Sequence, residues 1–258
     1  MSQSPSARGR VLPRLKPVEN VTLRDQVTQS VRGALMNGHF QPGEAVTVKA
    51  ICSMVGASVM PAREAMNRLI AEGALELRAN RSVRVPVLAR AEFDELTSLR
   101  CHLEGMAAAQ AVAHVQPAHI QRLRQLEAAM HRAGRTGDAD GYLNGNFQFH
   151  FLLYELGASR FVLSVIETMW VRVGPLIRSC FNPTGFAASS RLHAAIIQAL
   201  ENKDEASLRN AIVADISEAA LSIREVQEQR AAEGTPRPKP AEAARRGRTA
   251  AAHGRKRA

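Results

Sequence analysis

The chain has 258 residues, 45% of them apolar, which is enough for two modest domains. No apolar run approaches the roughly 20 residues that cross a bilayer, and no apolar segment follows the basic N-terminus as a secretory signal would require. Three cysteines without a CxxC pair fit a reducing compartment. We therefore expect a cytoplasmic protein without a membrane partner.

The net charge of +10 comes from the two ends of the chain. Residues 1–16 carry +4 and residues 230–258 carry +7, which leaves −1 for residues 17–229. We interpret residues 1–18 and 230–258 as basic disordered arms. Such arms strengthen contact with nucleic acid in a salt-dependent way, but they do not select a sequence.

Residues 19–86 predict three short helices followed by a hairpin. Thr22 and Asp25 are spaced as a cap pair at the start of the first helix. The second helix should begin after Thr47 and end at Gly56, because glycine readily takes the left-handed conformation of a helix end.

The third helix should start at Ser58 and stop at Gly73. Pro61 falls in its first turn, where a missing N–H costs nothing. Two short alternating runs follow at residues 75–77 and 83–85 and predict a hairpin with basic residues at its tip. This order of elements is typical of proteins that place a helix in the major groove of DNA.

After a linker at residues 87–90, the apolar periodicity becomes that of helices. Residues 91–229 predict six helices with short connections and no strand pattern, which favours an antiparallel bundle. On the first of them we expect Phe93, Leu96 and Leu99 to face inward. The fold class is therefore mainly α, a winged helix-turn-helix followed by an all-α bundle.

The first domain resembles the winged helix-turn-helix of the GntR family of bacterial transcription regulators. The matching residues follow the pattern P-x-R-E-A-L-x-x-L-x-x-E-G-L, with Met66 in place of a leucine and Ala74 before the last one. They are Pro61, Arg63, Glu64, Ala65, Leu69, Glu72, Gly73 and Leu75. The match extends over about 65 residues in one register, which is far more specific than a lone motif.

This resemblance implies a repressor, not an enzyme, that binds a two-fold symmetric operator in double-stranded DNA as a homodimer. The residues it assigns to DNA contact are Lys49, Ser58, Val59, Met60, Arg63 and Arg81. Val59 and Met60 stand where the family usually carries Arg-Thr, so the operator should differ from the family's common one. Such a protein would associate with the bacterial nucleoid when bound to DNA. The alternative for Arg63 is an ordinary solvated helix charge.

The bundle resembles the FCD effector-binding domain of the FadR-type branch of the family. The likeness rests on the order of the domains and on three short motifs, Leu99-Arg100-x-x-Leu103-Glu104-Gly105, Phe149-His150 and His193-x-x-Ile196-x-x-Ala199-Leu200. It implies a small carboxylate effector and a divalent metal ion, with no organic cofactor. The positions that match the usual metal ligands are Asn146, His150, His193 and Asp215.

Two imidazoles, a carboxylate and an amide oxygen suit Zn²⁺, Ni²⁺ or Mn²⁺. Asn146 and Asp215 replace an Asp and a His of the usual set, and the amide weakens the site. Asp215 lies on an apolar stripe, where a carboxylate needs an ion pair or a metal. The alternative is a polar cluster in which the histidines bond to Asp215 without metal.

Arg100 and Arg172 are candidates to pair with the effector carboxylate. Each is equally well explained as an exposed helix charge. Two other functions stay open at this point. One is a metal-dependent enzyme built on the bundle, and the other is a non-specific nucleic-acid-binding module that depends on the basic arms.

Overall fold

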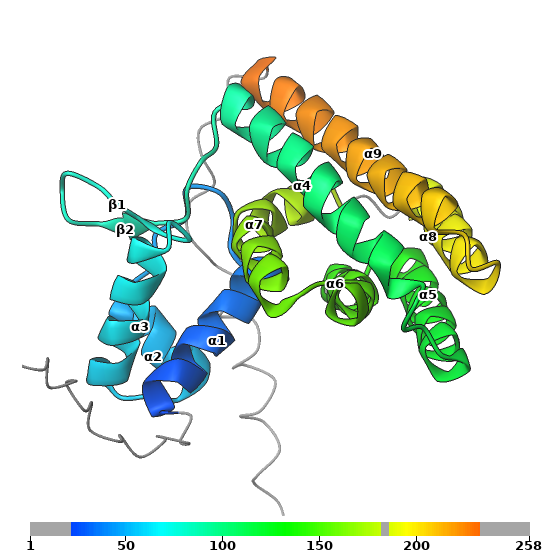
Figure 1. The fold of residues 1–258 in the computed structure, drawn as a ribbon. Coiled ribbons are helices and arrows are strands. Elements are labelled where there is room, and N and C mark those ends of the chain that lie inside the picture. Colours follow the sequence, from blue (N-terminus) through cyan, green and yellow to red (C-terminus); the bar gives the residue numbers. More distant parts are fainter. Residues whose placement is uncertain (1–21, 182–185, 233–258) are drawn as a thin grey trace, which may run out of the picture.

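The computed structural model describes residues 22–181 and 186–232. The predicted arms lie outside these ranges except for residues 230–232, where the prediction of disorder is wrong because the last helix continues to Ala232. The described chain forms a winged-helix unit beside an all-helical bundle, as predicted (Figure 1). The first unit contains α1 (Leu23–Met36), α2 (Val48–Val55), α3 (Val59–Ala71), β1 (Glu76–Leu77) and β2 (Val83–Arg84). The bundle contains α4 (Arg90–Ala111), α5 (Pro117–Thr136), α6 (Ala139–Gly157), α7 (Arg160–Ser179), α8 (Phe186–Glu201) and α9 (Glu205–Ala232).

Local sequence explains where the first helices begin and end. Thr22 and Asp25 form a reciprocal capping box at the start of α1. The hydroxyl of Thr47 caps α2, and Gly56 ends that helix with a φ of 67°. Ser58 is the N-cap residue of α3, but its side chain makes no capping hydrogen bond. Its hydroxyl is therefore available to a partner.

The wing is a minimal antiparallel hairpin in which Glu76 pairs with Arg84. The turn between its strands gives Arg81 a φ of 61°, a conformation that residues other than glycine adopt infrequently. Asn80 supports the turn, because its side-chain oxygen accepts hydrogen bonds from the backbone N–H and the hydroxyl of Ser82.

In the bundle, α4 lies along α9 and also packs on α6, while α5 and α8 pack against each other (Figure 1). Phe93 and Leu96 of α4 are buried as predicted, but the prediction for Leu99 is wrong, since this side chain is 56% exposed. The buried face of α4 continues through Arg100 and Glu104 instead. These two charges tolerate burial because they neutralise each other.

The two units share one core. Buried apolar side chains continue from Val31 and Leu35 of α1 to Val173 and Leu176 of α7, and the two helices pack directly on each other. Over residues 22–181 and 186–232, no helix combines the length and apolar character needed to cross a bilayer.

Candidate functional site

The start of α3 projects from the winged-helix unit as an exposed tip. Ser58, Val59, Met60 and Arg63 are all exposed, and the side chain of Met60 is 68% accessible. The opposite face of α3 is buried in the unit's core through Ala62, Ala65, Met66 and Leu69. The helix is thus held rigidly from behind while its first turn is free to contact another molecule.

The cations of the winged-helix unit differ in whether they have partners. Arg68 is bound to Asp25 at 2.9 Å and to Glu72 at 3.0 Å, so it serves the fold. By contrast, Lys49, Arg63 and Arg81 are exposed, and in the described part of the chain none makes an ion pair. These are the cations that the sequence analysis assigned to DNA. Unpaired positive charge beside an exposed helix tip suits the phosphates that flank a groove.

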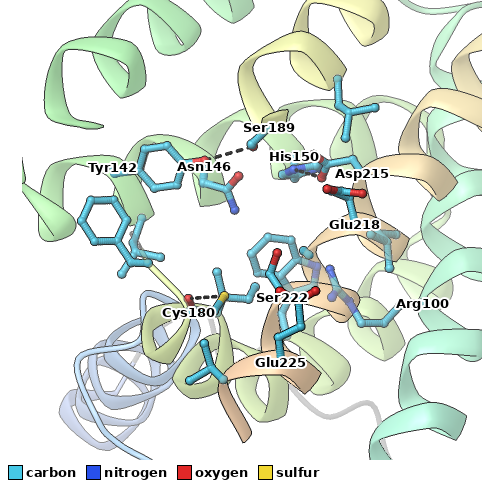
Figure 2. Close-up of a pocket in the computed structure, with 18 of the residues that line it drawn as sticks. Arg100, Tyr142, Asn146, His150, Cys180, Ser189, Asp215, Glu218, Ser222 and Glu225 are labelled. Carbon is cyan, nitrogen blue, oxygen red and sulfur yellow. Dashed lines mark hydrogen bonds and ion pairs between the residues drawn. The ribbon is translucent and has the colours of Figure 1, made fainter. Parts of the chain in front are cut away.

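The bundle contains a pocket of about 460 Å³ between α4, α6, α7, α8 and α9 (Figure 2). Asn146 and His150 enter it from α6, since residues four apart share one face of a helix. Asp215 enters from α9, and Trp170 of α7 lines the wall. His193 of α8 does not line the pocket but lies next to Asp215, and it is 1% exposed.

Three buried groups converge beside the pocket. The Nε2 atom of His150 lies 3.3 Å from Asp215 Oδ2, and the Nε2 atom of His193 lies 3.7 Å from Asp215 Oδ1. One ligand atom from each residue falls within 4.8 Å of the others. The Nε2 atom of His193 has no hydrogen-bond partner, although it is buried. A buried polar atom without a partner is costly, so this arrangement favours a cation between the three residues.

The other nitrogen of each imidazole is already held. Tyr154 donates its hydroxyl proton to Glu104 at 2.7 Å, so it can only accept from His150 Nδ1, which lies 3.1 Å away. His193 Nδ1 donates to the carboxylate of Glu127 at 2.9 Å. Both rings therefore direct Nε2 toward Asp215. This support from a second layer of residues is the usual arrangement around histidines that bind metals.

The electrostatics agree with that geometry. Burial alone lowers the pKa of His193, but the hydrogen bond to Glu127 and the charge of Asp215 outweigh it and raise this pKa above its ordinary value. Burial raises the pKa of Asp215, yet the hydrogen bond from His150 and the charge of His193 lower it overall. Asp215 is thus a carboxylate in a buried place, and positive charge must accompany it.

The residues present fit a divalent metal ion. His150, His193 and Asp215 would hold it, and such an ion would supply open positions for an acidic ligand. The amide of Asn146 is 9% exposed, lines the same pocket and has no hydrogen-bond partner among the described residues. Figure 2 places it on the same side of the pocket as His150. The alternative, a cluster held together by protons, uses the same three residues.

The two candidate arginines lie in different places. Arg100 lines the pocket and is 5% exposed, with Glu104 Oε1 2.6 Å from its Nε atom. Arg172 does not line the pocket. Its guanidinium lies over Gly73 at the end of α3, where an added Cβ would come within 2.5 Å of it. Arg172 therefore lies at the contact between the two units.

Sequence reasoning missed the residues that orient the histidines. Glu127 follows a buried leucine on α5 and carries no motif that marks it. Glu104 is four residues from Arg100, a spacing that permits an ion pair. Its further contacts with Tyr154 and Trp170 depend on helices distant in the sequence.

A winged-helix unit with an exposed first turn on its third helix, joined to a helical bundle, is typical of DNA-binding proteins. Comparison with known families agrees. The model of the gntR family of bacterial regulatory proteins matches residues 23–85, and the FCD domain model matches residues 95–218. The chain belongs to the GntR family of transcriptional regulators and carries an FCD domain. Some FCD domains bind metal ions.

Individual relatives lead to the same class. The HTH-type transcriptional regulator McbR of Escherichia coli is 28% identical over 215 residues, which are 82% of this chain and 97% of McbR. The solved structure of E. coli McbR/YncC matches with a TM-score of 0.74 and 27% identity over 81% of this chain and 99% of that one. A GntR structure from a Rhodococcus species matches in fold, with a TM-score of 0.63, 20% identity and coverage of 78% and 97%.

A third relative is named "Probable D-xylose utilization operon transcriptional repressor" and comes from Paenarthrobacter nicotinovorans. It is 25% identical over 189 residues, which are 73% of this chain and 83% of the relative. The family and these relatives are regulators of transcription, not enzymes. The hypothesis of a metal-dependent enzyme is therefore wrong.

Proposed function

We propose that this regulator is a repressor that binds a two-fold symmetric operator as a homodimer, and that a small organic acid bound beside a metal ion controls its DNA binding. The observation that carries the DNA-binding part is the exposed first turn of α3, in a unit that also exposes the unpaired cations Lys49, Arg63 and Arg81. The protein would act in the bacterial cytoplasm, where its operator is accessible.

In this proposal α3 enters the major groove with its N-terminal turn toward the base edges. Arg63 lies one turn into the helix and reaches a guanine edge or a phosphate. Val59 and Met60 cannot donate hydrogen bonds, and they contact thymine methyl groups instead. Lys49 on α2 and Arg81 on the wing bind phosphates on either side, which fixes the register of the helix.

Two considerations support a homodimer and a repressor. One recognition helix covers only a half-site of a few base pairs, so two copies related by a two-fold axis are needed for a selective operator. The relative from Paenarthrobacter is named as a repressor. A bound dimer that covers a promoter blocks transcription without further contacts.

For the ligand-sensing part, we propose that Zn²⁺, Ni²⁺ or Mn²⁺ binds to His150, His193 and Asp215, with Asn146 as a fourth and weaker ligand. An acidic effector would complete the coordination, and Arg100 would orient it from the wall of the pocket. The effector regulates DNA binding only if it has different affinities for two arrangements of the protein. The direct contact of α7 with α1 supports such coupling, because α7 also lines the pocket.

The deciding experiment is selection of bound sites from a random DNA pool with the full chain, repeated with each metal and a panel of organic acids. A two-fold symmetric consensus whose recovery changes with metal and acid supports the proposal. Equal recovery of all sequences contradicts it. A protein that loses all affinity when residues 1–16 and 230–258 are removed would instead be the non-specific module.

A further inference from the structure

The pocket in the bundle carries an excess of negative charge. Its charged lining residues are one cation, Arg100, and three carboxylates, Asp215, Glu218 and Glu225. A divalent ion at the proposed metal site would compensate Asp215, but Glu218 and Glu225 would still disfavour a ligand that is only an anion, because like charges repel more strongly in a partly enclosed site than in water.

The single cation of the pocket is already compensated. Arg100 places its Nε 2.6 Å from Glu104 Oε1 and a terminal nitrogen 3.2 Å from Oε2, with both residues buried. Glu104 also accepts hydrogen bonds from Tyr154 and Trp170, so this pair is locked into the core. Arg100 can still donate a hydrogen bond to a ligand, but the pair as a whole contributes no net positive charge.

The two outer carboxylates have no such compensation. Glu218 and Glu225 are exposed residues of α9, and neither makes an ion pair within residues 22–181 and 186–232. They are seven residues apart, which is two helical turns or about 10 Å along the axis. Figure 2 shows both on the α9 side of the pocket, with Glu218 beside Asp215 and Glu225 further toward the end of the helix.

The inner end of the pocket has a different character. Asn146 is more than nine-tenths buried, lines the cavity and has no hydrogen-bond partner among the described residues. Its amide faces the pocket and can therefore hydrogen-bond to a polar group of a ligand at the inner end. The proposed metal site lies at the same end and favours an oxygen anion.

From these two ends we propose that the pocket selects a zwitterion, an organic acid that also carries a primary or secondary amine. The carboxylate lies at the inner end, beside Asn146 and the metal, and the protonated amine lies between Glu218 and Glu225. This assignment rests on the proposed ligand-sensing function and names the class of ligand that the site prefers. Glu218 and Glu225 follow Asp215 by three and ten residues on α9, so an amine between them lies about 10 Å along the axis from Asp215. A metal ion, a carboxylate and a chain of about four to six carbons span that distance.

A matched set of probes tests the assignment on the full-length, metal-loaded protein. The probes are 5-aminopentanoate, which has both groups, glutarate, which has two carboxylates, and 1,5-diaminopentane, which has two amines. Binding is followed by calorimetry and by the fluorescence of Trp170, the only tryptophan of the chain and a wall residue of the pocket. We expect 5-aminopentanoate to bind about tenfold more tightly than glutarate, since two partly exposed ion pairs contribute a few-fold each.

The variant Glu218→Gln/Glu225→Gln should remove this preference, with weaker binding of 5-aminopentanoate and tighter binding of glutarate. Glu228→Gln is the matched control, because Glu228 lies one turn further along α9, pairs with Arg90 and does not line the pocket. A preference for glutarate in the unaltered protein, an unchanged preference in the double variant, or no binding of 5-aminopentanoate overturns the assignment.

DNA-binding measurements with the same samples separate this inference from the proposed function. If glutarate binds better and changes operator affinity, the proposal that an organic acid controls DNA binding is supported, and the assignment of a zwitterion is wrong. If 5-aminopentanoate binds through the two glutamates but leaves operator affinity unchanged, the ligand class stands and the proposed control of DNA binding falls.

Discussion

Gly174 of α7 lies in backbone contact with Met36 of α1, since a Cβ added to Gly174 would come within 2.5 Å of the Met36 carbonyl oxygen and 2.3 Å of that of Leu35. Gly38 makes a similar approach to the Gly174 carbonyl oxygen. The winged-helix unit therefore rests on α7 with no side chain between the two backbones. Because the same helix supplies Ile177 to the pocket wall, a shift of α7 on ligand binding must move α1 or break this contact.

The first prediction concerns this contact. Gly174→Ala should lower the free energy of unfolding by about 1–3 kcal/mol, the usual cost of forcing extra volume into a packed site. It should also weaken the effect of a bound effector on operator affinity. Thermal unfolding and operator titrations with and without effector measure both quantities. Gly33→Ala is the control, since a Cβ there meets nothing within 4 Å and alanine favours the helix by up to about 1 kcal/mol.

The second prediction concerns the recognition helix. Arg63→Ala should weaken binding to the selected operator by roughly 1–3 kcal/mol if the arginine reads a guanine. Circular dichroism should remain unchanged, because Arg63 is exposed and has no partner in the described chain. Arg24→Ala, an exposed arginine at the start of α1, is the comparison. Equal affinities of the Arg63 variant and the unaltered protein for the operator would contradict the proposal that α3 enters the major groove.

The third prediction separates fold from function at the wing. Arg81→Gly should stabilise the protein by a few tenths of a kcal/mol to about 1 kcal/mol, because glycine accepts a φ of 61° without strain. The same change should weaken operator binding and reduce the slope of log affinity against log salt by about one, as expected for one lost phosphate contact. A weaker operator complex with an unaltered slope would argue against a phosphate contact at this position.

The fourth prediction concerns the metal. Purified protein incubated with Zn²⁺, Ni²⁺ or Mn²⁺ should retain one ion per chain by elemental analysis, and His193→Ala should retain none. Asn146→Asp should tighten binding, since a carboxylate is a stronger ligand than an amide. The control is His131→Ala, which alters a histidine of α5 outside the cluster. If the unaltered protein retains no stoichiometric metal, the three residues form a hydrogen-bonded cluster without metal.

The fifth prediction concerns pH. His193 must lose its proton from Nε2 before this atom can bind a metal, and the pKa of His193 is raised. Competition between protons and the metal therefore begins at a pH above the ordinary histidine pKa of about 6.5 and increases as the pH falls. Apparent metal affinity should fall as the pH decreases through this range, by about tenfold per unit for one proton. Glu127→Gln should shift the fall to lower pH, because it removes the carboxylate that raises the pKa. An unshifted profile would mean that another group sets it.

Much of the architecture follows from local sequence. The capping pair Thr22 and Asp25, the left-handed Gly56 and the period of the apolar residues specify helices from neighbours three or four positions away. The same short range makes the P-x-R-E-A pattern at Pro61 informative, because one exposed helix carries it.

The sequence by itself determined the class of protein, since the motif that identifies it lies on consecutive short elements, and it predicts which residues contact DNA. Only the tertiary structure decided which residues meet around the pocket. That Glu127 orients His193, and that Glu104 also binds Tyr154 and Trp170, depends on helices far apart in the chain. Periodicity records which residues are apolar, but whether a charge is buried depends on the partner that packing brings to it.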